Sequence, residues 1–476
     1  MNHDTICALA TANGIGAIGI IRISGEQSFE IVNKIFEGKN LEKANSHTIH
    51  YGFIVDDKIF DSAQTDNHQP STINQIDEVM VSVFKAPKTF TAEDSVEISF
   101  HGSPFIAKKI LEVLTKNGAR MAKAGEFTMR AFMNGRIDLS QAESIADLIA
   151  SENEASRKVA LNQLKGGITN EISILRTDLL NFVSLIELEL DFAEEDVEFA
   201  DRTALQSLLN KIEIKLNSLI ESFQYGNAVK NGVAVAILGK PNAGKSTLLN
   251  ALLKEERAIV SDIAGTTRDT IEEILHIKGN AFRLIDTAGL RETSDEIEKI
   301  GVAKAKEKSD KADVLVYLID TASEDISEDV SLLKELMRND LKVIICFTKI
   351  DSNVIANEAN PSQLITLASQ LSTFETIKIS AKENINLDEL KEKLTHYVEN
   401  LKTEESVVIT NQRHFEALGK SLEAVKKVEE AVQIKISTEL LAYELRNALE
   451  YLGEISGEFT NDEVLGNIFS KFCIGK

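Results

Sequence analysis

The chain has 476 residues, which is too long for a single hydrophobic core and predicts about two to four domains. Its net charge of −23 excludes nucleic-acid binding through the overall field, so any contact with RNA needs a local basic patch or a partner. Its three cysteines, Cys7, Cys346 and Cys473, are too far apart for a disulfide framework or a cysteine-rich metal site, and they indicate a reducing cytoplasm.

The N-terminal part of the chain mixes short strands and helices. Residues 15–23 and 78–84 are apolar or alternating, as in strands, whereas 28–36 and 103–118 have the apolar spacing of amphipathic helices. We therefore predict an α+β domain. Residues 5–21 carry no charge, but Asn and Gly interrupt this run and no Lys or Arg precedes it, so we expect neither a signal sequence nor a membrane span.

Two helical tracts flank an alternating α/β segment. Residues 140–164 and 175–190 are predicted to be helical, because their apolar positions recur every three or four residues. From residue 233 buried strands alternate with helices up to a last helix at 387–401, which is the pattern of a doubly wound α/β fold. The chain after about residue 405 is helical again, so we predict that the α/β segment is inserted into a discontinuous helical domain.

The strongest motif joins the first strand of the α/β segment to its helix. Residues 239–246, Gly-Lys-Pro-Asn-Ala-Gly-Lys-Ser, match the G-x-x-x-x-G-K-[ST] pattern of a P-loop and lie between a buried strand and a helix. Backbone N–H groups of such a loop close around phosphate oxygens, and the helix dipole adds to their attraction. We predict that Lys245 reaches the β- and γ-phosphates and that Ser246 binds Mg²⁺.

Two further loops indicate a response to the γ-phosphate. Residues 286–289, Asp-Thr-Ala-Gly, follow a strand and resemble the D-x-x-G loop of GTPases, in which Asp286 acts on Mg²⁺ through water and the Gly289 amide senses the γ-phosphate. Residues 265–269 lie between this loop and the P-loop and resemble a switch I segment. There Thr267 is the natural second Mg²⁺ ligand when the γ-phosphate is present.

Two loops at later strand ends predict a guanine base. Residues 348–351, Thr-Lys-Ile-Asp, resemble the N-K-x-D guanine reader, in which Asp351 accepts two hydrogen bonds from the guanine edge and Lys349 packs along the base. Thr348 replaces the usual Asn, and we expect its hydroxyl to make part of the same contact, with weaker affinity. Residues 380–382, Ser-Ala-Lys, resemble the loop that completes the guanine pocket, so GTP is predicted over ATP.

The residue after the D-x-x-G loop bears on the mechanism of hydrolysis. Ras-like enzymes carry a Gln just after this loop that orients the attacking water, whereas this chain has Leu290, which cannot do so. Another residue must therefore take that role. Asn242 in the P-loop is suited to ligate a monovalent cation at the phosphates, and such a cation offsets transition-state charge as an arginine finger does.

The predicted architecture is multidomain, with an α+β N-terminal domain, a discontinuous all-α helical domain and an inserted Ras-like α/β P-loop G domain. The predicted boundaries are 1–118 for the N-terminal domain, 119–228 and 403–476 for the two parts of the helical domain, and 229–402 for the G domain.

These motifs together resemble the MnmE (TrmE) family of tRNA-modification GTPases, over essentially the whole chain. The stretches that carry the resemblance are RISG (22–25), TAEDSVEISFHG (91–102), AGEFTMRAFMNGRIDLSQAESIADLI (124–149), GKPNAGKS (239–246), DIAGTTRDT (262–270), DTAGLRETSDEIEKIG (286–301) and FCIGK (472–476). The first two are similar to the family's folate-binding N-terminal domain, the third to the start of its helical domain, and the last to its tail.

The resemblance implies that two G domains dimerise across their switch faces when K⁺ and GTP are bound. Asn242 and backbone oxygens of Ser261, Ile263 and Thr266 match the family's K⁺ site. Glu298 matches the glutamate that positions the attacking water, and the implied catalytic residues are Glu298, Lys245 and Asn242. The implied GTP-contacting residues are Asn242, Ala243, Gly244, Lys245, Ser246, Thr247, Ser261, Asp262, Ile263, Ala264, Gly265, Thr266, Thr267, Asp286, Thr287, Ala288, Gly289, Thr348, Lys349, Ile350, Asp351, Ser380, Ala381 and Lys382.

The resemblance also implies a folate site that supplies a one-carbon unit from 5-formyl- or 5,10-methylene-tetrahydrofolate. Arg22, Glu97, Arg136 and Lys476 match the folate-contacting positions. Family members usually carry Lys where Arg136 stands, which keeps the charge and changes the geometry. Cys473 matches a cysteine near this site, with either a chemical or a packing role.

The implied reaction adds an aminomethyl or carboxymethylaminomethyl group to C5 of the wobble uridine (U34) of certain tRNAs, with either glycine or ammonium as the amine donor. The chain would act as a homodimer with a partner, the FAD- and NADH-using protein MnmG, in a heterotetramer or larger complex. Residues 105–136 hold seven Lys or Arg against two Glu, which form either an RNA-facing patch or a solvated helix face.

Three other functions compete with this one. A ribosome-assembly GTPase needs a basic RNA-binding module, and the sequence offers none. A folate-dependent transferase with an inactive G domain is disfavoured by the intact set of Lys245, Ser246, Thr267 and Asp286. The missing glutamine suggests a switch that binds GTP and barely hydrolyses it. Glu298 and the K⁺ site argue against this function, because they would replace the role of the glutamine in hydrolysis.

Overall fold

The computed structural model describes residues 4–56, 74–191, 202–256, 273–285, 301–323, 326–338, 340–351, 374–402, 407–434, 438–459, 462–470, 472 and 475. The chain forms two compact units. The first comprises Met1–Ala146, Gln163–Arg176 and Glu450–Lys476, and the second comprises Asp147–Asn162 and Thr177–Leu449. Each unit contains one β-sheet.

The first unit is built on a seven-stranded sheet with the strand order β3-β4-β5-β6-β2-β1-β7. Its strands are β1 (Ile6–Leu9), β2 (Ile18–Ser24), β3 (Phe36–Glu37), β4 (Thr48–Val55), β5 (Gln75–Phe84), β6 (Ser95–His101) and β7 (Arg120–Met121). Neighbouring strands are antiparallel, except that β1 and β7 are parallel. This unit therefore has the α+β character that the N-terminal sequence predicts.

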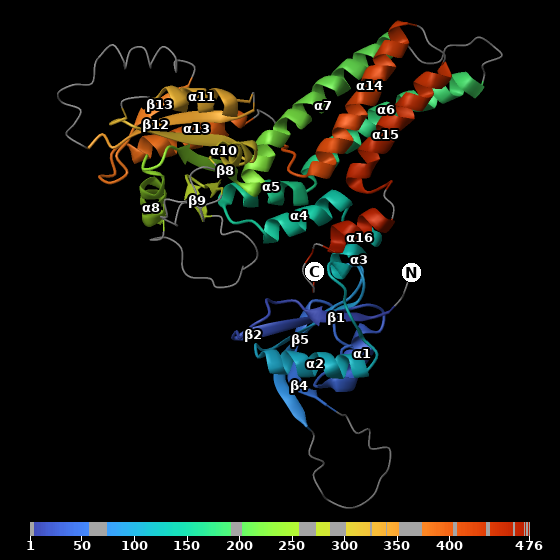
Figure 1. The fold of residues 1–476 in the computed structure, drawn as a ribbon. Coiled ribbons are helices and arrows are strands. Elements are labelled where there is room, and N and C mark those ends of the chain that lie inside the picture. The colour runs from blue at the N-terminus through green and yellow to red at the C-terminus, as the bar shows by residue number, and fades with distance from the viewer. Residues whose placement is uncertain are drawn as a thin grey trace, which may run out of the picture. The chain divides into compact units, whose positions relative to one another are not determined.

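The two faces of this sheet differ because side chains alternate along each strand. Ile21 and Ile23 of β2 and Ile98 of β6 point into a core that they share with helices α1 (Ser28–Ile35) and α2 (Pro104–Lys116). Figure 1 shows these two helices side by side against the sheet. Arg22 and Glu97 occupy the intervening positions and therefore lie on the opposite face.

Helix α3 (Glu126–Met133) and the C-terminal helix α16 (Asp462–Ser470) pack together in the first unit. Ala131 and Phe469 belong to the buried cluster between them. Gly125 begins α3 with a φ of 66°, and a Cβ there would lie 2.5 Å from the Phe469 carbonyl oxygen. Only glycine therefore allows the C-terminal segment to approach α3 this closely.

The described part of the helical tracts contains six further helices, four of which are longer than any helix around the first sheet. They are α4 (Leu139–Ile149), α5 (Glu154–Leu164), α6 (Gly167–Asp191), α7 (Arg202–Asn231), α14 (Gln412–Gln433) and α15 (Thr438–Ser456). In the second unit α7 and α14 lie side by side (Figure 1), and the Phe223 and Phe415 rings stack with centroids 4.5 Å apart.

The helical pattern predicted over 140–164 is confirmed except at residues 150–153, which separate two helices. The first helix, α4, ends at Ile149, and the second, α5, begins at Glu154 directly after Asn153. Asn153 Oδ1 accepts a hydrogen bond from the Ser156 backbone N–H at 2.8 Å, which is the N-cap geometry that begins a new helix. A capping residue thus overrides a continuous apolar pattern.

The second unit contains a six-stranded sheet with the order β13-β12-β11-β8-β10-β9. Its strands are β8 (Val233–Gly239), β9 (Glu273–Ile277), β10 (Asn280–Leu284), β11 (Val314–Asp320), β12 (Lys342–Thr348) and β13 (Glu375–Lys378). All neighbours are parallel except β9 and β10, which form an antiparallel edge pair.

Helices cover both faces of this sheet, as the doubly wound pattern predicts. Alternate residues of β8 separate into two cores: Val235 and Ile237 pack with α8 (Lys245–Glu256) and α13 (Leu387–Leu401), whereas Ala236 and Leu238 pack with α11 (Ser327–Leu336). The remaining helix is α10 (Gly301–Asp310). Among the described residues, no helix is long and apolar enough to cross a membrane.

Candidate functional site

The carboxyl ends of the parallel strands bring the predicted nucleotide-binding loops to one edge of the six-stranded sheet. β8 ends at Gly239 in the P-loop, β12 ends at Thr348 in the predicted guanine reader, and β13 is followed by Ser380. Ligands of open α/β sheets bind outside this edge. The structure therefore brings together the loops that the sequence motifs assigned to phosphate and base.

The P-loop backbone depends on residues with unusual φ angles. Gly239 has a φ of 150°, and a Cβ there would lie 2.4 Å from the Leu318 carbonyl oxygen, so only glycine fits beside β11. Asn242 has a φ of 60°, which is uncommon for a residue with a side chain. Strain of this kind gathers at ligand-binding loops. A Cβ on Gly244, in contrast, would point into open space, so the cradle ahead of α8 has room for a phosphate.

The Lys245 ammonium lies over the mouth of this loop. Its Nζ donates hydrogen bonds to the carbonyl oxygens of Gly239 at 2.9 Å and Lys240 at 2.8 Å. These two bonds hold the positive charge where the phosphates of a bound nucleotide would lie. Ser246 follows on the first turn of α8, at the positive end of the helix dipole.

A second lysine anchors the outside of the P-loop. Lys240 Nζ forms ion pairs with Asp329 at 3.2 Å and Glu328 at 3.1 Å, both at the start of α11. Asp329 is buried and also accepts a hydrogen bond from the Tyr317 hydroxyl at 2.8 Å. The P-loop is therefore tied to β11 and α11, and Lys240 and Asp329 also line a pocket beside it.

The predicted guanine reader is built around a fixed carboxylate. Asp351 Oδ1 accepts a hydrogen bond from the buried Ser380 hydroxyl at 2.6 Å, and this bond is the main reason that the pKa of Asp351 lies below its usual value. The carboxylate, which is ionised at neutral pH as an ordinary aspartate is, is thereby held in one direction. Lys349 has a φ of 63°, and its Nζ lies 2.6 Å from Asp320 Oδ2.

Thr348 connects this loop to the P-loop. Its side chain is buried, and its Oγ1 donates a hydrogen bond to the Ala243 carbonyl oxygen at 2.8 Å across 105 residues of sequence. A hydroxyl has one hydrogen to donate, so in this arrangement Thr348 serves the P-loop backbone. The guanine contact that the sequence predicts for this hydroxyl would use its remaining acceptor capacity.

The predicted folate residues of the first unit also come together. Arg22 of β2 and Glu97 of β6 are directly opposite in the antiparallel ladder, and Arg22 Nη2 lies 2.8 Å from Glu97 Oε1. The Arg22 and Arg136 guanidinium carbons lie 5.0 Å and 5.4 Å from the centroid of one ring, that of Phe90. Sequence reasoning missed Phe90, although an aromatic residue in the polar stretch Lys88–Glu93 was a visible signal.

A network of ion pairs holds α3 beside this group. Arg120 pairs with Asp4 and Glu126, both at 2.6 Å, and Arg130 pairs with Asp4 at 2.8 Å and Glu93 at 3.3 Å. Burial opposes the ionisation of Glu126, but hydrogen bonds from Arg120 and the Lys123 backbone N–H bring its pKa below the usual value.

These pairs also bear on the basic tract 105–136. Arg120 and Arg130 pair with carboxylates inside the unit, and Lys108 and Lys109 pair with Glu112 on α2. Four of its seven basic side chains are thus offset by nearby acids, which weakens the interpretation of this tract as an RNA-facing patch.

Several predicted residues lie outside the described part of the chain. They are Ser261, Asp262, Ile263, Ala264, Gly265, Thr266, Thr267, Asp286, Thr287, Ala288, Gly289, Leu290, Glu298, Cys473 and Lys476. Of the other two cysteines, Cys7 and Cys346 are buried free thiols, and burial raises the pKa of each to about 12. Neither is suited to nucleophilic chemistry.

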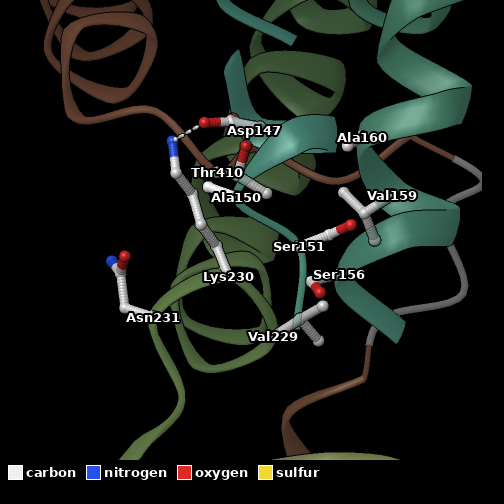
Figure 2. A pocket seen from close by; sticks show the side chains of 10 residues that line it. All are labelled: Asp147, Ala150, Ser151, Ser156, Val159, Ala160, Val229, Lys230, Asn231 and Thr410. Carbon is white, nitrogen blue, oxygen red and sulfur yellow. Dashed lines mark ion pairs between the residues drawn. The ribbon is translucent and has the colours of Figure 1, made fainter. Parts of the chain in front are cut away.

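A further pocket lies at the end of α7 in the second unit (Figure 2). Lys230 and Asp147 form an ion pair of 2.8 Å across it, and Ser156 and Thr410 also line it. None of the predicted site residues belongs to this pocket. In the part of the chain that the structure describes, no group of three or more His, Cys, Asp or Glu side chains is arranged to hold a metal ion.

Two family models and several full-length relatives match this chain. The model of the MnmE helical domain matches residues 139–473, and that of the GTP-binding protein TrmE N-terminus matches residues 5–136. The chain is 49% identical to the tRNA modification GTPase MnmE of Flavobacterium johnsoniae and 47% identical to that of Bacteroides fragilis, over the full length of both chains in each case.

Among solved structures, Aquifex aeolicus Era bound to GDP·AlF4− is 29% identical, with a TM-score of 0.26, and covers 40% of this chain and 66% of that one. The full-length identity to the curated relatives and the two matching domain models confirm the resemblance that the motifs predicted. The chain therefore belongs to the MnmE (TrmE) family of tRNA modification GTPases, which are GTP hydrolases that act in tRNA modification.

Proposed function

We propose that this chain is a K⁺-dependent GTPase that acts with MnmG on C5 of the wobble uridine (U34) of certain tRNAs. The product is an aminomethyl- or carboxymethylaminomethyluridine whose one-carbon unit comes from a tetrahydrofolate. The observation that carries the proposal is the convergence of Lys245 and the Asp351–Ser380 pair on one edge of the six-stranded sheet. That arrangement offers a cation for phosphates and a fixed acceptor for guanine.

The proposed nucleotide site uses mainly preformed contacts. Gly244 leaves room for a phosphate ahead of α8, and the N–H groups of the first helical turn attract its negative charge. Lys245 supplies the ammonium. Ser246, with Thr267, would hold Mg²⁺, which when bound offsets the charge of the β- and γ-phosphates. Asp286 is proposed to act on the same ion through water, and the Gly289 amide to sense the γ-phosphate.

Hydrolysis needs a residue that orients water and a charge that offsets the transition state. Leu290 cannot orient water, so we assign this role to Glu298, which matches the family's glutamate. Asn242 lies in the P-loop with its backbone already in the left-handed region. With backbone oxygens of Ser261, Ile263 and Thr266, it would hold K⁺ beside the phosphates.

The first unit is proposed to bind the tetrahydrofolate. Arg22 and Arg136 present guanidinium donors and Glu97 presents an acceptor on the face of the sheet that α1 and α2 leave uncovered. This donor and acceptor set suits a ligand with carboxylates and a hydrogen-bonding heterocycle. Lys476 is proposed as a fourth contact, and Cys473 as a neighbour of the site with either a chemical or a packing role.

The remaining partners follow from family membership. We propose a homodimer whose G domains associate across their switch faces, joined by MnmG, which supplies FAD and NADH chemistry. The domains proposed are 1–118, 119–228 with 403–476, and 229–402. The acidic charge of −23 suits a division of labour in which MnmG provides much of the tRNA affinity. We propose the cytoplasm as the compartment.

The K⁺-dependent mechanism is tested by steady-state GTP hydrolysis in KCl and in NaCl at equal ionic strength. We expect K⁺ to raise the rate about tenfold or more, because a cation of the right size at the phosphates stabilises the transition state. Asn242→Ala should abolish the difference between the two salts, and Glu298→Ala should abolish hydrolysis in both. Asn250→Ala, on the exposed side of α8, is the matched control and should behave as the wild type.

Equal rates in the two salts, together with an active Glu298→Ala variant, would show that the proposed mechanism is wrong for this chain. GTP binding and the role in tRNA modification would be unaffected by that result, because they depend on other residues.

A further inference from the structure

Phe90 lies within the charged group on the face of the first sheet opposite α1 and α2. Its ring centroid is 5.0 Å from the Arg22 guanidinium carbon and 5.4 Å from that of Arg136. Arg22 also lies 5.8 Å from the ring of the buried Phe127. Two guanidinium groups from segments more than 100 residues apart thus share one aromatic ring.

The loop that carries Phe90 is fixed to the elements around it. Asn134 Nδ2, just after α3, donates to the Thr91 carbonyl oxygen at 2.7 Å, and Arg130 of α3 pairs with Glu93 at 3.3 Å. The Phe90 ring packs against the small buried cluster that contains Phe127. The ring is therefore held by its own backbone and by packing beneath it.

A ring in this position restricts both arginines. The face of an aromatic ring is negative and attracts a guanidinium group, and a planar guanidinium stacked on a ring keeps its N–H donors in one plane. Arg22 is also fixed by Glu97 at 2.8 Å, whereas Arg136 is exposed, so Phe90 is the described contact that restrains it. A lysine at this position could not stack in the same way, so the arginine of this chain and Phe90 act as a pair.

We propose that Phe90 is a positioning residue of the folate site, which orients the guanidinium groups of Arg22 and Arg136 toward a folate ligand. The inference rests on the proposed folate function and adds to it a residue that sets the geometry of two of its contacts. Phe90 itself need not touch the ligand. Its effect is to lower the cost of ordering two long side chains when the ligand binds.

The test is calorimetric titration of 5-formyltetrahydrofolate into the full-length protein. We expect Phe90→Leu, which keeps apolar bulk and removes the ring face, to weaken binding about tenfold. Phe90→Tyr keeps the ring and should bind within about twofold of the wild type. Phe105→Leu is the matched control, because Phe105 is 69% exposed on α2, and this variant should bind as the wild type.

A purely structural role for Phe90 is separated by combining Phe90→Leu with Arg136→Gln. If the ring acts through the Arg136 guanidinium, Phe90→Leu should reduce folate affinity clearly less in the Arg136→Gln background than in the wild type. An equal loss of affinity in both backgrounds would show that the ring does not act through Arg136 and would overturn the inference that it orients both arginines. Should Phe90→Leu fail to fold, Phe90→Met takes its place with the same expected loss.

Two failures are distinguishable. If the wild type binds the folate and Phe90→Leu binds equally well, only the positioning role is wrong. If the wild type does not bind the folate at all, the proposed folate function is wrong and the inference falls with it.

Discussion

Replacing Asp351 with asparagine is expected to weaken GTP binding by roughly a hundredfold or more and to create a preference for xanthosine triphosphate. Guanine presents two neighbouring donors, N1–H and the exocyclic amino group, and a carboxylate accepts from both. An asparagine amide offers one acceptor and one donor, so one guanine donor would face another donor. Xanthine has an oxygen in place of the amino group and matches the amide.

The structure explains why this carboxylate is so sensitive. Ser380 donates a 2.6 Å hydrogen bond to Asp351 Oδ1 and lowers the pKa of Asp351, so the acceptor is charged and already oriented before the base arrives. Competition between labelled GTP and xanthosine triphosphate measures the change. Asp388→Asn, at a side chain that is 95% exposed on α13, is the control and should leave both affinities unchanged. Unchanged GTP affinity in Asp351→Asn would place the base elsewhere.

Lys245→Ala is expected to lower the rate of GTP hydrolysis about 10²- to 10³-fold, the loss typical of removing one preorganised donor from a transition state. The ammonium is held by the carbonyl oxygens of Gly239 and Lys240 before any nucleotide binds. Little free energy is therefore needed to position the ammonium when negative charge shifts toward the leaving phosphate oxygen. Single-turnover hydrolysis at saturating GTP measures this effect on the chemical step separately from binding.

The matched control for this variant is Lys254→Ala, which removes an exposed lysine from the same helix, α8. It should hydrolyse GTP at the wild-type rate. A Lys245→Ala variant that retains more than about a tenth of the wild-type rate would show that the P-loop ammonium is not a main source of charge stabilisation in this chain.

The nucleotide-binding edge could be predicted from the sequence because its signals are local. A strand, a glycine-rich turn and a helix follow one another within 233–256, and the guanine-reading motif comes directly after a buried strand. Parallel strands then bring such loops to one edge without further information. The two faces of the sheet were also predictable, since alternate buried positions of β8 separate into two cores.

Contacts between distant segments left no such signal. Nothing near Thr348 in sequence indicates that its hydroxyl donates to Ala243, 105 residues earlier. Phe90 stands out locally as an aromatic residue in a polar stretch, but its partners Arg22 and Arg136 come from other parts of the chain, so its role left no local signal. The break near Asn153 is different: its capping bond to Ser156 is local, and the apolar periodicity on both sides concealed it.

Family membership decides between the functions that compete on sequence grounds. A full-length identity of 49% to a tRNA modification GTPase makes a separate role in ribosome assembly unnecessary. The structure adds a reason to expect nucleotide chemistry at the edge of the six-stranded sheet. Lys245 is held by carbonyl oxygens of the P-loop, and Ser380 donates a hydrogen bond to Asp351.

The most direct test of the central claim is reconstitution of the tRNA modification. The purified protein is combined with MnmG, an unmodified tRNA carrying U34, 5,10-methylenetetrahydrofolate, FAD and NADH, with glycine or ammonium in separate reactions, and the nucleosides are identified by mass. We predict that a modified wobble uridine forms only when both GTP and the folate are present. The Lys245→Ala variant should form no product. Equal product with GDP in place of GTP, or without any folate, would contradict the account.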